Sequence, residues 1–445
     1  MKKNLIRAAF LAPAIVASTA SVYAEPIRPV DDRPNIIYIY TDDLGWGDIE
    51  PFGQTLIRTP ALSRMADEGM RFTDHYASVP VCQPSRYCLM MGVHNGNSAT
   101  RDNSNFAFPA GTPTMARSLQ DAGYATAMFG KWGLGRLGTT GEPLEQGFDE
   151  FVGYTNQVAA HNYYPTSLER NRGSFPLPEN VNDGRGIYSH DLFTAEALAF
   201  IAREWDKPFF LYLPYTIPHN DQVVPYDSAE EYDGVFPENP NADSDQPNAS
   251  YAGQITRLDR DVCRILDKLV ELGIEQNTLV IFDSDNGPTG IGGNSISLFK
   301  SNGPFRGTKR SLFEGGIRVP MIAWWPGTVP AATTSDLANV QYNFYPTFAE
   351  LAGANVPATI DGRSIVPTLK GGTQPEQDFI YWEFQGNQAI RIGQYKGYRP
   401  NGIPGDLQIY DLAVDPGESN NIAASMPALV TQMNNLLDAN QSADF

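Results

Sequence analysis

The sequence predicts an α/β fold in which a large, mostly parallel β-sheet is flanked by helices on both faces. Short apolar runs alternate with segments of helical periodicity along most of the chain, which is the pattern of repeated strand–helix units. The chain has 445 residues, a length that exceeds what one hydrophobic core usually serves, and its hydrophobic content of 42% is ordinary for a globular protein. We therefore expect one large domain and a smaller companion.

Five short apolar runs are predicted to form buried strands of this sheet. They are residues 35–40, 125–129, 209–213, 279–282 and 319–324.

Three helices are predicted among these strands. The first begins with Thr59 as N-cap and Pro60 at its first position, and Gly69 ends it. The second covers residues 250–272, which carry apolar residues at helical spacing. The third, roughly residues 85–91, follows Cys82 and places that side chain near the positive end of the helix.

The N-terminus has the pattern of a secretory signal peptide. Basic residues and an apolar run over residues 8–16 precede Val22-Tyr23-Ala24, a small-residue cleavage pattern. We therefore predict that residues 1–24 are a signal peptide and that the protein is exported, to the periplasm or the medium. No later stretch is long and apolar enough to span a bilayer, so we expect no membrane partner.

The formal net charge of −19 argues against nucleic acid as a partner. An anionic substrate would have to be attracted by a local basic cluster. The three cysteines, Cys82, Cys88 and Cys263, form no Cys-x-x-Cys pair and show no zinc-ligand spacing.

Polar residues follow four of the predicted strands, at positions where folding does not require them. In an open α/β sheet the carboxyl ends of the strands gather at one edge, and ligands bind there. We therefore expect these residues to converge on one site. They are Asp42-Asp43, Lys131, His219 and Asp285-Asn286.

The acidic members of this set predict a metal site. Asp42, Asp43, Asp285 and Asn286 supply only hard oxygen ligands, which suits calcium or magnesium and argues against zinc or copper. Each acidic pair alone is also common in loops and turns. Both pairs at strand ends favour the metal interpretation, because a divalent cation relieves the repulsion between unpaired aspartates.

Basic residues complete the predicted site. Most of the 32 lysines and arginines are expected to be solvated surface charges. Lys131 and Lys309, however, lie among small residues rather than on an amphipathic face, and Arg86 follows Cys82. A tetrahedral dianion or monoester needs such donors, held in place before charge develops on the leaving oxygen.

Several motifs resemble those of the type I, formylglycine-dependent sulfatases. Cys82-Gln83-Pro84-Ser85-Arg86 has the Cys-x-Pro-Ser-Arg order of that family, and further motifs follow in the family's order. The resemblance implies the fold of the alkaline phosphatase superfamily, with a mixed sheet in a catalytic domain over residues 25–338. Residues 339–445 would then form an α+β subdomain with a small antiparallel sheet and a helix. The other matching motifs lie at residues 39–48, 130–132, 284–287, 313–320, 410–412 and 415–416.

The resemblance also implies hydrolysis of sulfate monoesters through a sulfated enzyme intermediate. In this family a formylglycine-generating or anaerobic sulfatase-maturating enzyme of the host oxidises the motif cysteine, here Cys82. The hydrate of the resulting formylglycine attacks sulfur. With Cys82 modified, Cys88 and Cys263 remain as a possible disulfide in an oxidising compartment. The family's calcium ligands fall on Asp42, Asp43, Asp285, Asn286 and the modified Cys82, and magnesium is less favoured.

The same resemblance assigns roles to the basic residues. Arg86 would hold the hydrate, and Lys131 would contact both the hydrate and sulfate. His219 and Lys309 would serve the leaving oxygen, which is a poor leaving group when the substrate is a sugar. Asp285 would take a proton from the attacking hydroxyl.

One position departs from the family pattern. Many sulfatases read Gly-Lys-Trp-His-Leu-Gly where this chain has Gly133 in place of the histidine, which usually contacts the hydrate. His161 is the candidate replacement, because it lies in a polar, aromatic segment. Its other interpretations are a histidine that contacts sugar and a structural histidine.

The substrate prediction also depends on resemblance. The Gly-Lys-Trp-Gly and Ala-His-Asn-Tyr-Tyr-Pro segments are similar to those of exported bacterial carbohydrate sulfatases. The favoured substrate is a galactose or N-acetylgalactosamine 4-sulfate of an algal galactan or glycosaminoglycan. The alternatives are an aryl sulfatase, a phosphonate or phosphate ester hydrolase of the same superfamily, and an inactive relative that binds sulfated glycans. The complete metal and basic set argues against the last.

Overall fold

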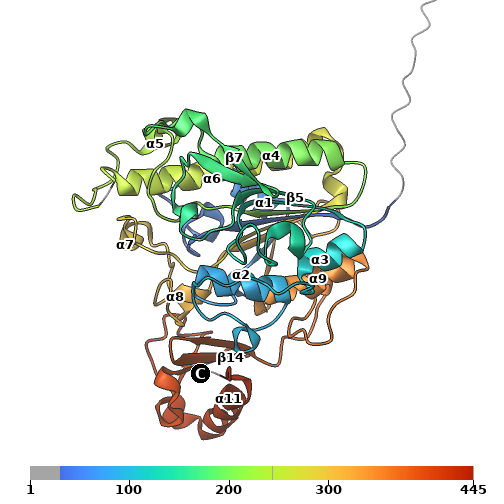
Figure 1. Ribbon diagram of the computed structural model, residues 1–445. Helices are drawn as coiled ribbons and strands as arrows, with labels where there is room; N and C mark the ends of the chain where they lie inside the picture. Colours follow the sequence, from blue (N-terminus) through green and yellow to red (C-terminus); the bar gives the residue numbers. More distant parts are fainter. Residues whose placement is uncertain (1–30, 243, 444–445) are drawn as a thin grey trace, which may run out of the picture. The chain divides into compact units, whose positions relative to one another are not determined.

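The computed structural model describes residues 31–242 and 244–443, and a ten-stranded mixed sheet lies at its centre (Figure 1). The strand order is β11-β2-β10-β9-β1-β8-β4-β5-β6-β7. The five strands from β9 to β5 are parallel, and antiparallel pairings flank them on both sides. This arrangement confirms the predicted fold class. The bounds are β1 (Asn35–Thr41), β2 (Met70–Phe72), β4 (Ala125–Lys131), β5 (Glu150–Tyr154), β6 (Ser167–Arg170), β7 (Gly173–Pro176), β8 (Phe209–Pro214), β9 (Thr278–Ser284), β10 (Met321–Trp324) and β11 (Thr333–Ser335).

The central strand β1 is buried along its whole length. Ile37 and Ile39 point into one apolar core, and Tyr38 and Tyr40 point into the other. Successive side chains alternate between the faces of a strand, so a strand covered on both faces is apolar at every position. All five predicted strands are present in the sheet.

Helices cover both faces of the sheet (Figure 1). The core on one face includes residues of α1 (Pro60–Asp67), α4 (Ser189–Glu204) and α6 (Pro247–Glu271). The core on the other face includes residues of α2 (Cys82–Met91), α3 (Met115–Asp121) and α9 (Phe344–Ala352). The sheet therefore separates two apolar layers.

The three predicted helices exist, but their N-termini differ from the expectation. The Thr59 side chain does not cap α1; the carboxylate of Asp259 on α6 accepts the N–H groups of Ala61 and Leu62, at 3.0 and 2.7 Å. A tertiary contact thus replaces the local cap. α2 begins at Cys82 itself, which lies in the first turn rather than before it.

The C-terminal region contains a four-stranded antiparallel sheet and a helix, as expected. The strands are β13 (Ile380–Phe384), β14 (Asn387–Ile392), β15 (Tyr395–Arg399) and β16 (Gln408–Asp411), and α11 (Pro427–Asn440) packs on β14. Residues 339–369 precede this sheet, and α9 within them packs in the main core. The domain boundary at residues 338 and 339 stays a prediction.

The cysteines are all unbonded, so the possible disulfide between Cys88 and Cys263 is absent. Cys88 lies on α2 and is buried in the core on one face of the sheet, whereas Cys263 lies on α6, which packs against the opposite face. The predicted signal peptide lies outside the described residues. Over the ranges that the structure covers, we find no helix with the length and apolar character needed to cross a membrane.

Candidate active site

The predicted site residues meet at the carboxyl edge of the parallel strands. Four segments deliver them from the ends of β1, β4, β8 and β9, and α2 and the loop before α8 (Glu314–Ile317) complete the site. The convergence follows from the parallel pairing of these strands, which brings their ends to one edge. The residues are Asp42, Asp43, Cys82, Arg86, Lys131, His219, Asp285, Asn286 and Lys309.

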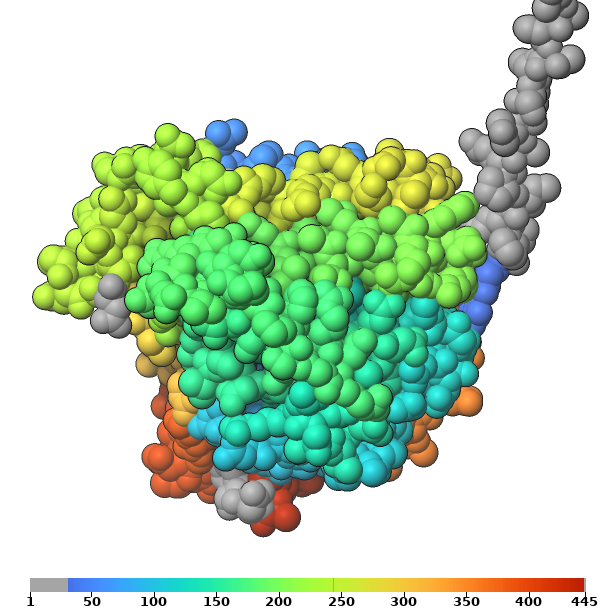
Figure 2. Space-filling model, turned by 45° about the horizontal axis from the view of Figure 1, so that its top comes forward, coloured from blue at the N-terminus to red at the C-terminus, as the bar shows by residue number. Residues whose placement is uncertain are grey.

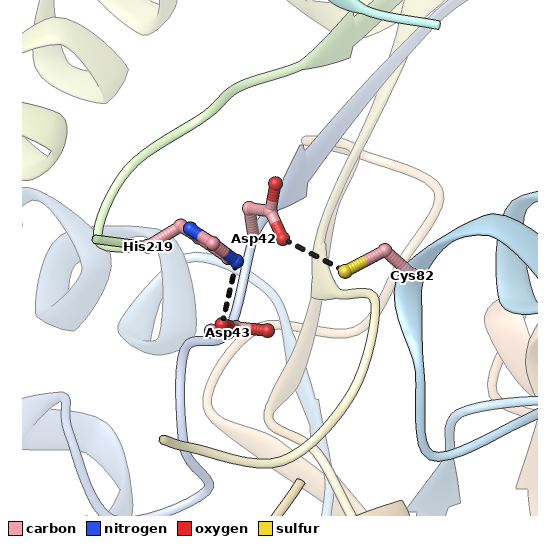
Figure 3. A group of neighbouring side chains, drawn as sticks. All are labelled: Asp42, Asp43, Cys82 and His219. Carbon is pink, nitrogen blue, oxygen red and sulfur yellow. Dashed lines mark hydrogen bonds and ion pairs between the residues drawn. The ribbon is translucent and has the colours of Figure 1, made fainter. Parts of the chain in front are cut away.

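Cys82 lies at the centre of this cluster and is 1% exposed. Its Sγ atom lies 3.4 Å from Asp42 Oδ1 and 3.3 Å from Lys309 Nζ. Figure 3 shows the side chain pointing from the start of α2 toward Asp42. Burial, together with the charges of Asp285 and Asp42, raises the pKa of the Cys82 thiol well above its ordinary value. The unmodified side chain is therefore a neutral thiol.

Asp42 is held by two buried cations. Lys131 Nζ donates to Asp42 Oδ2 at 2.6 Å, and Arg86 lies 3.6 Å from the same oxygen. Arg86 also donates to Asp285 Oδ2 at 2.8 Å and to the Lys131 carbonyl oxygen at 2.8 Å. Burial opposes ionisation of Asp42, but Lys131, His219 and Arg86 outweigh it and hold the pKa of this carboxyl well below its usual range.

Asp43 has a second set of partners. Asn286 Nδ2 donates to its Oδ1 at 2.6 Å, and Lys309 Nζ lies 2.7 Å from the same oxygen. His219 Nε2 lies 3.2 Å from Asp43 Oδ2, the contact drawn in Figure 3. Burial opposes the charge of Lys309, but Asp43 raises the pKa of Lys309 above its ordinary value. Lys309 therefore stays protonated.

The donor set fits a hard divalent cation. Carboxylate oxygens of Asp42 and Asp43, which are hard donors, lie within 4.8 Å of each other, and Cys82 Sγ and a ring nitrogen of His219 lie within the same distance of them. Asn286 Oδ1 is buried and accepts no hydrogen bond from the described residues, so it is free to bind a cation. Burial and the negative charge of Asp42 raise the pKa of Asp285 to about 7. A bound cation would relieve the repulsion between these two carboxylates.

Residues 34–354, well over half of the chain, match the family described as Sulfatase. The chain belongs to the sulfatase family. Residues 305–443 also match the family described as N-sulphoglucosamine sulphohydrolase, C-terminal. This sulfatase is therefore a sulfuric ester hydrolase, and the predicted recognition is confirmed.

Relatives and solved structures agree with this assignment. N-acetylgalactosamine-6-sulfatase of Canis lupus familiaris is 32% identical over 395 residues, which are 82% of this chain and 71% of the relative. Arylsulfatase A of Homo sapiens is 31% identical over 442 residues, which are 87% of this chain and 83% of the relative. The crystal structure of Ps i-CgsB matches with a TM-score of 0.80 and 30% identity over 92% of each chain. A second crystal structure holds Ps i-CgsB in complex with k-i-k-neocarrahexaose.

His161 reaches the site of this sulfatase through His219. The two imidazole rings stack with centroids 4.4 Å apart, and His219 Nδ1 lies 2.8 Å from the Asn220 carbonyl oxygen. Burial and the nearby positive charges of His219 and Lys131 lower the pKa of His161 to about 4, so it is neutral at neutral pH. The atoms nearest to the Cβ position of Gly133 belong to Gln157, and the catalytic role of His161 stays a prediction.

Two residues near the site were missed in the sequence. Gln341 is fully buried behind the catalytic edge, where its Oε1 accepts from Ser85 Oγ at 2.8 Å and its Nε2 donates to the Ser284 carbonyl oxygen at 2.6 Å. Gln157 fills the space beside Gly133, where a Cβ atom would lie 2.1 Å from its Nε2. Neither glutamine belongs to a motif, and no spacing in the sequence marks them.

Proposed function

We propose that this sulfatase removes sulfate from a galactose or N-acetylgalactosamine unit of a sulfated saccharide. One relative carries the name N-acetylgalactosamine-6-sulfatase, and Ps i-CgsB has been crystallised with a neocarrahexaose. The sequence resemblance favours the 4-sulfate, whereas that relative is named for the 6-sulfate, so both positions belong in the test. The observation that carries the proposal is the buried cluster around Cys82, in which cations and carboxylates surround one side chain.

The nucleophile proposed for this reaction is formylglycine derived from Cys82. When present, this residue supplies a hydrated aldehyde whose hydroxyl attacks sulfur. The neutral, buried thiol supports the proposal, because a thiol with a raised pKa is a poor nucleophile at neutral pH. A formylglycine-generating or anaerobic sulfatase-maturating enzyme of the host is the proposed partner for the oxidation.

Calcium is the proposed metal, with magnesium less favoured. Asp42, Asp43, Asp285 and Asn286 would hold it together with the modified Cys82. The unpaired Asn286 Oδ1 and the three carboxylates are the ligand types that calcium prefers. A bound ion supplies positive charge that balances these carboxylates and orients the oxygen ligands.

The basic residues of this chain divide between two tasks in the proposed reaction. Arg86 and Lys131 lie beside Asp42 and are assigned to the nucleophile and the sulfate oxygens. Lys309 stays protonated, and with His219 it is assigned to the leaving oxygen, which needs a positive donor when it departs as a sugar alkoxide. Asp285 is assigned to the proton of the attacking hydroxyl.

Export to the periplasm or the medium remains part of the proposal. It depends on the signal pattern of residues 1–24. Sequencing the N-terminus of the protein recovered from its native host tests it, because processing after Ala24 is expected.

The test of function combines mass analysis with activity. After expression in the native host, the peptide that contains Cys82 should show the mass of formylglycine, and the protein should release sulfate from galactose or N-acetylgalactosamine 4- or 6-sulfates. Cys82→Ala should fold and lose turnover, because only a small side chain changes. Cys88→Ala, a buried cysteine on the same helix, is the matched control and should retain turnover.

Each alternative has its own outcome in that test. Preference for aryl sulfates over every sulfated sugar would favour an aryl sulfatase, and preference for aryl phosphonates would favour the phosphonate hydrolase. An unmodified thiol without sulfate release from any substrate would refute the proposal.

A further inference from the structure

The side-chain amide of Gln157 is buried, and the part of the chain that the structure describes supplies it with no hydrogen-bond partner. Its Nε2 and Oε1 both lack a partner among the described residues, and neither is accessible to solvent. The large majority of buried side-chain polar atoms in folded proteins have a hydrogen-bond partner, and leaving one unpaired costs about 1–3 kcal/mol. Packing alone therefore does not account for a glutamine here.

The surrounding structure holds this amide in place. The segment before it is anchored by Glu169, which accepts the Thr155 N–H at 2.7 Å and the Thr155 hydroxyl at 2.9 Å. The amide rests on Gly133, and any side chain at that position would collide with it. The glycine and the anchored turn thus make room for Gln157 against Gly133, which follows Lys131 by two residues.

Gln157 lines a cavity of about 430 Å³, whose lining also includes Gly133 and Gln83, the residue that follows Cys82. This volume is within the range of about 300–1,000 Å³ typical of ligand sites. The lining is rich in neutral amides and hydroxyls, includes the ring of Phe106, and among the described residues contains no aspartate, glutamate or lysine. The one cation in that lining is Arg136, which is exposed and bonded to Asn105.

Gln83 connects the cavity to the reaction centre. It follows Cys82 on α2 and donates to the Gly133 carbonyl oxygen at 2.6 Å, while its Oε1 accepts the Ser104 N–H at 2.7 Å. Two walls of the cavity are therefore bonded to the residue next to the proposed nucleophile. In Figure 2 the light-blue and teal parts of the chain, which contain these walls, meet on the face turned toward the viewer.

We propose that Gln157 determines specificity by binding hydroxyl groups of the sugar that carries the sulfate, with the sugar ring in this cavity. The inference rests on the proposed function and adds the contact that recognises the sugar. A sulfate group could satisfy only the N–H donors of the amide, because sulfate oxygens only accept. A pair of sugar hydroxyls can both accept from Nε2 and donate to Oε1.

Recognition requires the amide to turn from Gly133 into the cavity, since its polar atoms are shielded in the structure. The rest of Gln157 is partly exposed, so rotation about its side-chain torsions does not displace the core. The hydroxyl groups of the bound sugar then form hydrogen bonds with the amide of Gln157.

The test compares a sugar substrate with one that lacks the sugar. Gln157→Leu is assayed in the matured, full-length protein on a sulfated galactose oligosaccharide and on 4-nitrophenyl sulfate. We expect kcat/KM for the oligosaccharide to fall about 10- to 100-fold, the loss of one or two hydrogen bonds, with the aryl value changing less than about threefold. Gln146→Leu is the matched control: its Oε1 is also buried and unpaired, but it does not line the cavity, so the ratio of the two values should stay unchanged.

Binding gives a second readout. In the Cys82→Ala background, which cannot turn over, Gln157→Leu should raise the Kd for the oligosaccharide by a similar factor. An equal loss on both substrates, or an unchanged Kd, would overturn the role of Gln157. Failure of the proposed function looks different, because the parent protein itself would then release no sulfate from the oligosaccharide, whatever its rate on 4-nitrophenyl sulfate.

Discussion

The imidazole rings of His161 and His219 stack with their centroids 4.4 Å apart and their planes 26° from each other. His219 in turn lies 3.2 Å from Asp43, a proposed metal ligand. His161 therefore contacts the cluster through His219, and its predicted part in place of the histidine absent at Gly133 stays a prediction.

Replacing His161 separates support from direct catalysis. His161→Phe keeps a ring against His219 and should retain most of kcat, whereas His161→Ala should lower kcat about tenfold, because an unsupported His219 loses its orientation. Steady-state kinetics on a sulfated sugar measure both. Equal loss in the two variants, with covalently sulfated protein accumulating in single-turnover mass spectra, would instead assign His161 a direct part in sulfate expulsion.

Removing the metal should inactivate the enzyme reversibly. Chelation is expected to abolish activity, and calcium should restore it better than magnesium, with zinc ineffective, because the ligands are hard oxygens. Asn286→Leu should weaken the thermal stabilisation that calcium gives, since it removes the unpaired Oδ1. Asn95→Leu is a comparison at another buried asparagine, and its response to calcium should persist. Full activity after exhaustive chelation would contradict the metal site.

Gln341 joins the segments that carry the site. Its amide bonds Ser85 on α2, Tyr40 on β1 and the Ser284 carbonyl on β9. Gln341→Leu removes these buried hydrogen bonds and should reduce the free energy of unfolding by about 2–4 kcal/mol, as measured by urea denaturation. Gln385→Leu, at an exposed glutamine, should change it by less than about 0.5 kcal/mol. Similar losses in both variants would rule out this network as the cause.

The ionised carboxylate of Asp261 should make the free energy of unfolding depend on pH in the acid range. Burial opposes its charge, but hydrogen bonds and charges from His190, Arg264 and Thr194 lower its pKa to about 2. The folded pKa lies below the unfolded value, so the contribution is present above about pH 4 and is lost as the pH falls toward 2.

The corresponding variant is Asp261→Asn. It should be less stable than the parent protein by about 2 kcal/mol at pH 6, and the difference should shrink as the pH falls from 4 to 2. Thermal unfolding across this range measures it. A difference that stays constant with pH would show that the carboxylate charge does not contribute.

The elements with local signals were predictable. The apolar run before Asp42 and the helical spacing before Gly273 depend on neighbouring residues, and both elements lie where expected. The N-terminal cap of α1 was predicted wrongly, because Asp259 supplies it from a distant helix. The unbonded Cys88 and Cys263 are a similar case, since their separation by the sheet is a property of the fold alone.

The sequence by itself determined the catalytic edge. Parallel strands bring their carboxyl ends together, so polar residues after four apolar runs had to meet, and their types already specified hard ligands and cations. Only the tertiary structure decided which neutral residues complete the site. Gln341 and Ser85 are 256 positions apart in the sequence, yet their side chains share a hydrogen bond. Gln157 became a candidate only because the structure buries its amide beside Gly133 without a partner among the described residues. Such contacts depend on the geometry of packed, distant segments, and a glutamine carries no local signal of the partner it will meet.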